Sequence, residues 1–361
     1  MEWIQVWVDD CLVAAQPQLV GELQADNPRG RVTVSFRYAN EWLAETGPGF
    51  AIDPELPLGP GDFFVPSPRT LHGVLRDTAP DRWGRRLMDR RERDEAASQS
   101  RRPRTLSDWD YLLGVQDQSR LGALRLRDPD SGRWLDDRIP GIPPITRLRE
   151  LEAAASRLEA DPTADLDPAI SSQLQPGSSL GGTRPKATFR DSDGSLWIAK
   201  FPSRDDRIDV AGAEFLLHQL TSACGIHVPP ARLESLAGRG RTFCVQRFDR
   251  QDSQRRLYWS AMTLLGRADG EDASYLDIAE ARDIPPGSPI HMVLRGTRKP
   301  HHQESLSLGP GGPKRLKVDR ATLHEHPADK AFTGSMHLER SIGVRSDRTL
   351  ILPGLNGQEA I

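Results

Sequence analysis

The first 65 residues alternate apolar and polar positions with the two-residue period of half-buried β-strands. The segments WIQVWV (3–8) and RVTVSFRYA (31–39) carry this alternation and are rich in β-branched and aromatic residues. Between them, DNPRGR (26–31) supplies the proline and glycine of a turn. The pattern predicts a small β-rich unit at the start of the chain.

Apolar residues spaced by three and four positions predict helices further along the chain. Residues 71–75 and 83–88 show this spacing on either side of Pro80, which predicts two helices with a break between them. Ser107 precedes an apolar run and is a residue type that caps helix N-termini. In residues 145–160, one helical stripe collects four apolar side chains: Leu148, Leu151, Ala155 and Leu158.

A proline- and aspartate-rich segment, residues 161–177, predicts a loop, and a glycine-serine stretch follows it. A short strand, LWIAKFP (196–202), then places Leu196, Ile198 and Lys200 on one face. The next helix is expected to end at Gly225 and to carry its apolar side chains on one face: Val210, Ala213, Leu216, Leu217 and Leu220. Residues 231–236 and 242–250 predict a pair of strands.

Composition changes abruptly near Ala281. Only Phe332 of the 22 aromatic residues lies beyond that position, whereas the last 80 residues contain 17 Gly or Pro. A segment so poor in large apolar side chains buries too little surface to offset the entropy of ordering. We expect a divergent, disordered or poorly packed tail over residues 282–361.

The remaining composition is that of a soluble protein, and a length of 361 residues favours two domains or one two-lobed domain. The net charge of -3 gives no overall attraction to nucleic acid or membrane, and no apolar run is long enough to span a bilayer. The three cysteines form no CxxC pair, and the acidic start of the chain is unlike a signal peptide. A cytoplasmic location is expected.

The stretch from Gly177 to Ser203 has the parts that a phosphate site needs. Backbone N–H groups of a flexible loop converge on phosphate oxygens, and a strand lysine adds a point charge. Glu214, early in the following helix, is placed to orient Lys200, and residues 242–250 provide a strand that hinges two lobes. These pieces suggest an ATP-binding lobe. The alternative that the residues leave open is a lysine extending from a strand edge into water.

Several segments, in this order, resemble HipA-type serine/threonine kinases, the toxins of bacterial toxin-antitoxin pairs. They are GDFFVPSP, LRDTAPDRWGRRLM, GSSLGGTRPKA, WIAKFPS, VQRFDR with YWSAMTLLG, and SYLDIAE. The resemblance runs from near the start of the chain to about Ala281. It implies an α+β, two-lobed protein-kinase-like fold: residues 1–100 as a HipA N-terminal-like subdomain, 101–281 as an ATP-binding lobe with a helical insert, and 282–361 as the tail.

The resemblance also implies site residues and partners. It places ATP contacts at Gly181, Gly182, Thr183, Arg184, Lys186, Lys200 and Glu214, with a hinge at Gln246, Arg247 and Phe248. Ser179 would be the autophosphorylated serine. The cofactors implied are ATP and Mg2+. The partners are a HipB-like helix-turn-helix antitoxin, through which alone DNA would be contacted, and a target such as an aminoacyl-tRNA synthetase.

The family's catalytic and magnesium-binding segments have no counterpart here. Its Asn-Thr-Asp-Asp-His and Tyr-Asp segments are missing after SYLDIAE, and the surroundings of Asp319, at about the expected distance, match nothing. Catalytic and metal residues therefore remain unknown. One change of reading frame near codon 281 would explain the missing motifs and the altered composition together.

Two rival functions follow from these observations. The chain could be a non-catalytic pseudokinase that binds an antitoxin or a nucleotide. Alternatively, the arginine-rich helix from Asp81 to Arg91 could bind DNA directly, although the acids interleaved with its arginines favour an ion-paired, solvated face.

Overall fold

The structure is a computed structural model. It describes residues 2–26, 32–136, 141–174, 183–236, 238, 240–251, 254–268, 271–274, 277–278 and 281, and after these the backbone of strands between 291 and 350. Side chains are described between residues 3 and 281, except those of residues 168, 169 and 172 within that part.

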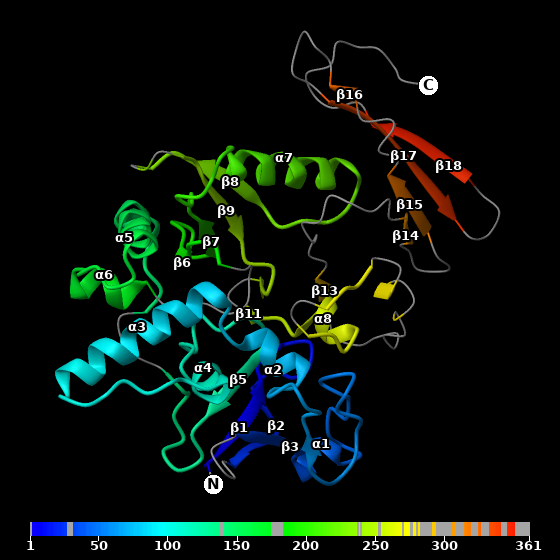
Figure 1. The fold of residues 1–361 in the computed structure, drawn as a ribbon. Coiled ribbons are helices and arrows are strands. Elements are labelled where there is room, and N and C mark those ends of the chain that lie inside the picture. The colour runs from blue at the N-terminus through cyan, green and yellow to red at the C-terminus, as the bar shows by residue number, and fades with distance from the viewer. Residues whose placement is uncertain are drawn as a thin grey trace.

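The start of the chain folds into an antiparallel sheet of order β4-β3-β2-β1-β5 (Figure 1). Its strands are β1 (Glu2–Val8), β2 (Gln18–Asp26), β3 (Thr33–Tyr38), β4 (Phe63–Phe64) and β5 (Leu124–Arg127). The predicted β-rich unit is thus present, and β5 extends its sheet well past residue 100. We call residues 2–136, with this sheet and the helices α1–α4, the N-terminal unit.

Four helices accompany this sheet: α1 (Asn40–Leu43), α2 (Gly73–Thr78), α3 (Arg82–Ser98) and α4 (Asp108–Leu113). The break at Pro80 lies between α2 and α3, as predicted. Asp81 caps α3 by accepting a hydrogen bond from the Gly84 N–H. Ser107 caps α4 as expected, and Asp110 completes a capping box with it.

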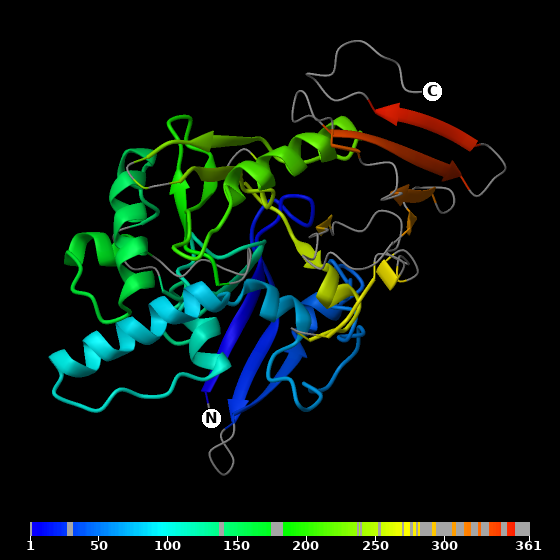
Figure 2. The ribbon, with the colours of Figure 1, turned by 45° about the horizontal axis from the view of Figure 1, so that its top comes forward.

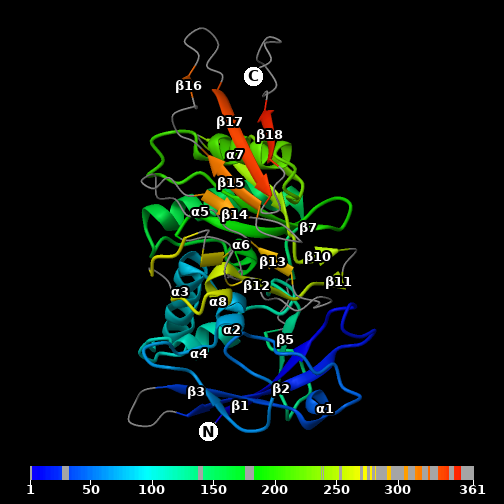
Figure 3. The ribbon, with the colours of Figure 1, turned by 90° about the vertical axis from the view of Figure 1, so that its right-hand side faces the viewer.

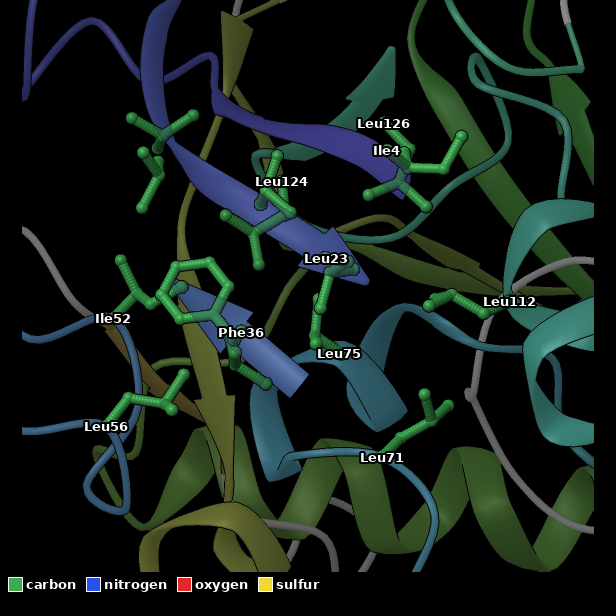
Figure 4. Close-up of a cluster of buried hydrophobic side chains, with 14 of the residues drawn as sticks. Ile4, Leu23, Phe36, Ile52, Leu56, Leu71, Leu75, Leu112, Leu124 and Leu126 are labelled. Atoms are coloured by element: carbon green, nitrogen blue, oxygen red, sulfur yellow. The ribbon is translucent and has the colours of Figure 1, made fainter. Parts of the chain in front are cut away.

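One face of the N-terminal sheet is buried against α2 and α4. Figure 4 shows Leu23 and Phe36 from the strands facing Leu75 of α2, and Leu112 of α4 beside them. All four side chains are essentially inaccessible to solvent. Leu257 and Trp259 from a later part of the chain join the same cluster, so this core is not built by the N-terminal residues alone.

A second antiparallel sheet has the order β6-β7-β9-β8. Its strands are β6 (Lys186–Arg190), β7 (Leu196–Lys200), β8 (Ala231–Glu234) and β9 (Thr242–Gln246). The helix α5 (Leu148–Ala160) covers one face with the predicted stripe, all of which is buried. Figures 1 and 2 show α5 beside this sheet and α7 (Val210–Ala223) along it.

One prediction about this region was wrong in part. The expected loop over residues 161–177 contains a short helix, α6 (Pro168–Gln173), with proline at its favoured first position. On α7, Val210 of the predicted apolar face is buried, whereas Leu216 is 45% and Leu217 63% exposed. Instead, Phe215 and His218 turn toward Phe243 of β9, because these two positions lie on the helix face nearest the sheet.

Past the second sheet come β10 (Arg250–Gln251), β11 (Gln254–Arg255), β12 (Tyr258–Ser260) and α8 (Ala261–Leu264). In the tail, β13 (His291–Val293) pairs with β12 in parallel. The others are β14 (Ser305–Ser307), β15 (Lys314–Val318), β16 (His324–Glu325), β17 (Phe332–Arg340) and β18 (Arg345–Leu350). These five form one further sheet, which Figures 1 and 3 show apart from the N-terminal unit.

Among the described side chains, the two hydrophobic clusters draw their members from the range between Ile4 and Leu264. The architecture is a mixed α+β fold, as predicted. Among the described helices, none combines the length and apolarity needed to cross a bilayer.

Candidate nucleotide-binding site

Lys200 and Glu214 form an ion pair between the second sheet and α7. Lys200 is the last residue of β7, and its partner on β9 is Phe243, whose ring centroid lies 5.3 Å from the Lys200 Nζ. Ile198 shares this face with Lys200, as the alternation predicted, while Ala199 points to the α5 side. The ammonium is therefore oriented by a carboxylate on a partly apolar, partly exposed surface.

The position of Glu214 is set by the start of α7. Asp209 caps this helix by accepting a hydrogen bond from the Gly212 N–H, at 2.9 Å, and also pairs with Arg241. The hydrogen bond from Arg241 and that from Gly212 hold the pKa of Asp209 below its usual range. The cap fixes where α7 begins, which places Glu214 in its second turn, opposite Lys200.

The end of the glycine-rich stretch is tied to the loop between β7 and α7. Arg184 makes a forked ion pair with Asp206, with an Nη1 to Oδ1 distance of 2.8 Å. Asp206 also accepts a hydrogen bond from the Ser203 N–H at 2.9 Å. Thr183 is exposed beside this pair. The expected residues Ser179, Gly181 and Gly182 lie outside the described residues.

The Lys186 side chain is used inside the protein and not in an open ligand site. Its side chain is buried and forms an ion pair with Asp81, the residue that caps α3. The indole N–H of Trp83 donates to the Lys186 carbonyl at 3.0 Å. Sequence reasoning assigned Asp81 to a solvated face and missed this pair, because the partners are 105 positions apart.

The three hinge residues differ in orientation. The N–H groups of Gln246 and Arg247 donate to Pro230 O and Leu196 O, both at 2.8 Å. Phe248 packs edge-on against Tyr258, with centroids 5.1 Å apart. Arg247 is 2% exposed, so its side chain points into the protein and not toward a ligand.

Arg247 belongs to a buried charge cluster centred on Asp249, which is fully inaccessible. Asp249 accepts from Arg247 Nε at 2.9 Å, from the Gly122 N–H at 2.7 Å, and from Arg250. Burial opposes the charge of Asp249, but Arg247 and Arg250 together hold its pKa well below the usual range. The only sequence signal for this cluster was the alternation of charges in RFDR.

The arginine-rich helix α3 is ion-paired, as the interleaved acids favoured. Arg85 lies 2.6 Å from Asp108, and Arg90 lies 3.4 Å from Asp94. Arg91 donates to the Gly114 carbonyl at 3.1 Å. These arginines are used within the N-terminal unit, which weighs against direct DNA binding.

No metal centre is evident in the part of the chain that the structure describes. There, no group of three or more His, Cys, Asp or Glu side chains is arranged to hold a metal ion. Asp319 lies outside the described residues. All three cysteines are free, and only Cys11 is exposed.

Comparison with known proteins gives two family matches. Residues 11–107 match the HipA N-terminal domain, and residues 178–286 match the HipA-like C-terminal domain. The two ranges together cover more than half of the chain. The second match ends close to the change in composition at Ala281.

A solved structure with a similar fold comes from Shewanella oneidensis MR-1, in a toxin-antitoxin complex of HipA, HipB and operator DNA. It is 15% identical, with a TM-score of 0.44 over 74% of this chain and 57% of that chain. This chain therefore spans little more than half of the solved one. No curated protein matches the sequence.

Proposed function

Because this chain belongs to the HipA-like family, we propose that it is a cytoplasmic toxin-type protein that binds ATP through its second sheet. We call this sheet, with α5, α6 and α7, the nucleotide lobe. The observation that carries the proposal is the ion pair of Lys200 and Glu214 on the face of β7. A strand lysine held by a helix carboxylate is the arrangement that contacts nucleotide phosphates in kinase-like folds.

The residues present fit ATP in part. Lys200 would contact phosphate oxygens, and Glu214 would keep its ammonium directed at them. Phe243 would provide apolar surface beside that ammonium. The described carboxylates do not gather into a magnesium site, so no step is assigned to Mg2+.

The reaction of the family would be transfer of the ATP γ-phosphate to a serine of a target protein, such as an aminoacyl-tRNA synthetase. We propose that this chain does not catalyse that transfer. Orienting a serine hydroxyl needs a carboxylate, and the family segments that supply it are missing from the sequence. ATP binding without turnover is the expected behaviour.

An antitoxin is the proposed macromolecular partner. The HipA of the Shewanella complex is bound to HipB on operator DNA. A HipB-like helix-turn-helix protein is therefore proposed to bind this chain and to supply the contact with DNA. The ion pairs of α3 support an indirect role for DNA.

Titration calorimetry with ATP tests the nucleotide site. Lys200→Ala should weaken binding about ten-fold or more, because a charge-assisted phosphate contact is lost. Arg204→Ala, an exposed arginine in the next loop, is the matched control and should leave affinity unchanged. Equal affinity for Lys200→Ala and the intact chain would refute the site.

A phosphorylation assay separates the proposed state from an active kinase. Incubation with labelled ATP should leave Ser179 unlabelled. Label on Ser179 would show that the chain is an active kinase and would contradict the proposal.

The second candidate function is an antitoxin-binding protein without any nucleotide site. The N-terminal sheet and its buried core favour it. Antitoxin binding together with no measurable ATP binding would select this alternative.

A further inference from the structure

We propose that Asp249 is a positioning residue for the nucleotide site and that, through it, the N-terminal unit determines where the hinge backbone lies. The inference rests on the proposed nucleotide function. It concerns the network formed by Arg247, Asp249 and Arg250 with the segment 119–122, which we call the Asp249 network.

The backbone N–H groups of the hinge differ in whether the sheet already uses them. The sheet already uses the N–H groups of Gln246 and Arg247, which donate to Pro230 O and Leu196 O. Among the described residues, the N–H of Phe248 has no such acceptor. In this proposal, the N–H of Phe248 is the hinge group that contacts the base of the nucleotide. The position of Phe248 depends on the contacts that hold its neighbours, Arg247 and Asp249.

Those flanking residues are held from the N-terminal unit. Arg247 donates to Ser119 O and Arg120 O, both at 2.9 Å, and to both carboxylate oxygens of Asp249. Asp249 in turn accepts the Gly122 N–H at 2.7 Å. The side chains immediately before and after Phe248 thus reach the same short segment, about 127 positions earlier in the chain.

The segment that receives these bonds is itself rigidly supported. Arg120 is fully buried, and its guanidinium donates to the carbonyls of Leu112 and Val115, both at 3.0 Å. Burial lowers the pKa of Arg120 to about 10, so it stays protonated at neutral pH. Gly122 has a positive φ of 81°, and a Cβ there would lie 3.0 Å from the Tyr258 ring.

Among the described ion pairs, Asp249 is the acid that pairs with both Arg247 and Arg250. Removing the carboxylate charge leaves Arg247 and Arg250 buried without the acid they pair with, so we expect the strand end to shift. The phosphate side of the site has a separate support, the Arg184–Asp206 pair. The two supports should therefore affect opposite ends of a nucleotide.

Two ligands test whether the two supports act separately: adenosine for the base end of a nucleotide and tripolyphosphate for its phosphate end. Asp249→Asn should weaken adenosine binding about ten-fold and leave tripolyphosphate affinity within about two-fold. Asp206→Asn should do the reverse. Arg247→Lys, which keeps the charge but loses the forked geometry, should follow Asp249→Asn more mildly. Equal losses for both ligands in Asp249→Asn, or no loss for either, would overturn the positioning role.

Hydrogen exchange without ligand separates this proposal from the nucleotide function. If the intact chain binds neither adenosine nor tripolyphosphate, the proposed function fails. In that case, amide hydrogen exchange still tests whether the Asp249 network couples the N-terminal unit to the hinge. Asp249→Asn should speed amide exchange in both 116–122 and 243–251, while 186–190 stays unchanged. Unchanged exchange in either of the first two segments would refute the coupling.

Discussion

Lys186 and Lys200 lie directly opposite each other on the paired strands β6 and β7, yet their ammonium groups turn to different acids. Lys186 pairs with Asp81 of the N-terminal unit, and Lys200 pairs with Glu214 of α7. The first pair is nearly buried and the second is partly exposed. One lysine therefore joins the two units, and the other remains accessible for a ligand.

Asp81→Ala should destabilise the protein by about 2–4 kcal/mol. It removes the cap of α3 and leaves the buried Lys186 without its counter-ion. Urea unfolding measures the change. Asp94→Ala, on the exposed side of the same helix, should cost less than about 1 kcal/mol. Similar losses in the two variants would contradict the buried pair.

Glu214→Gln should separate ligand binding from stability. The Lys200–Glu214 pair is partly exposed, so the free energy of unfolding should fall by less than about 1 kcal/mol. ATP affinity should drop roughly three- to ten-fold because Lys200 loses its orienting charge. Calorimetry on the folded variant checks this, and unchanged affinity would rule out the orienting role.

The stability of the protein should depend on Glu92 at acid pH. Hydrogen bonds from Arg101 and from the Arg104 N–H lower the pKa of Glu92 from 4.5 to about 2. A depressed folded-state pKa gives stability that is present above pH 4.5 and is lost as pH falls to about 2. Glu92→Gln should flatten this decline in urea midpoints measured across that window. Arg101→Gln should flatten it too; an unaltered slope in both variants would disprove the linkage.

Leucine truncations should distinguish the two helices that flank the second sheet. Leu151→Ala in α5 should cost about 2–5 kcal/mol, because its side chain is fully buried. Leu217→Ala in α7 should change stability by no more than about 0.5 kcal/mol, because that side chain is 63% exposed. Thermal or urea unfolding compares them. A large loss for Leu217→Ala would mean that α7 is covered in solution.

The origin of residues 282–361 can be tested in the sequence of the gene. Translation of all three reading frames across codon 281 should reveal Asp-His and Tyr-Asp segments in another frame, if a frame change produced residues 282–361. The family match that ends at residue 286 is consistent with this idea. A clean gene without those segments would refute it and favour an authentic pseudokinase.

The apolar and polar pattern of the sequence correctly predicted helices and strands that depend on residues close together in the chain. The N-terminal strands, the break at Pro80 and the buried stripe of α5 follow from side-chain periods within a few turns or strand residues. The Lys200–Glu214 pair was also predictable, since only one loop separates β7 from α7.

Long-range pairings could not be predicted in the same way. The burial of Arg247 depends on a segment more than 120 positions earlier, and that of Lys186 on the cap of α3. The apolar residues of α7 were predicted to share one helix face, but hydropathy does not say which face of a helix meets the sheet. Side-chain type alone carried no information about these partners.

The pairing of β5 with β1 affects how the protein is synthesised. Val8, near the start of the chain, pairs with Leu124, so the first strand keeps an open edge until more than 120 residues have been made. An unpaired edge can pair with other chains and favours aggregation. Until β5 has been synthesised, the nascent chain therefore presents an open strand edge that can pair with another chain.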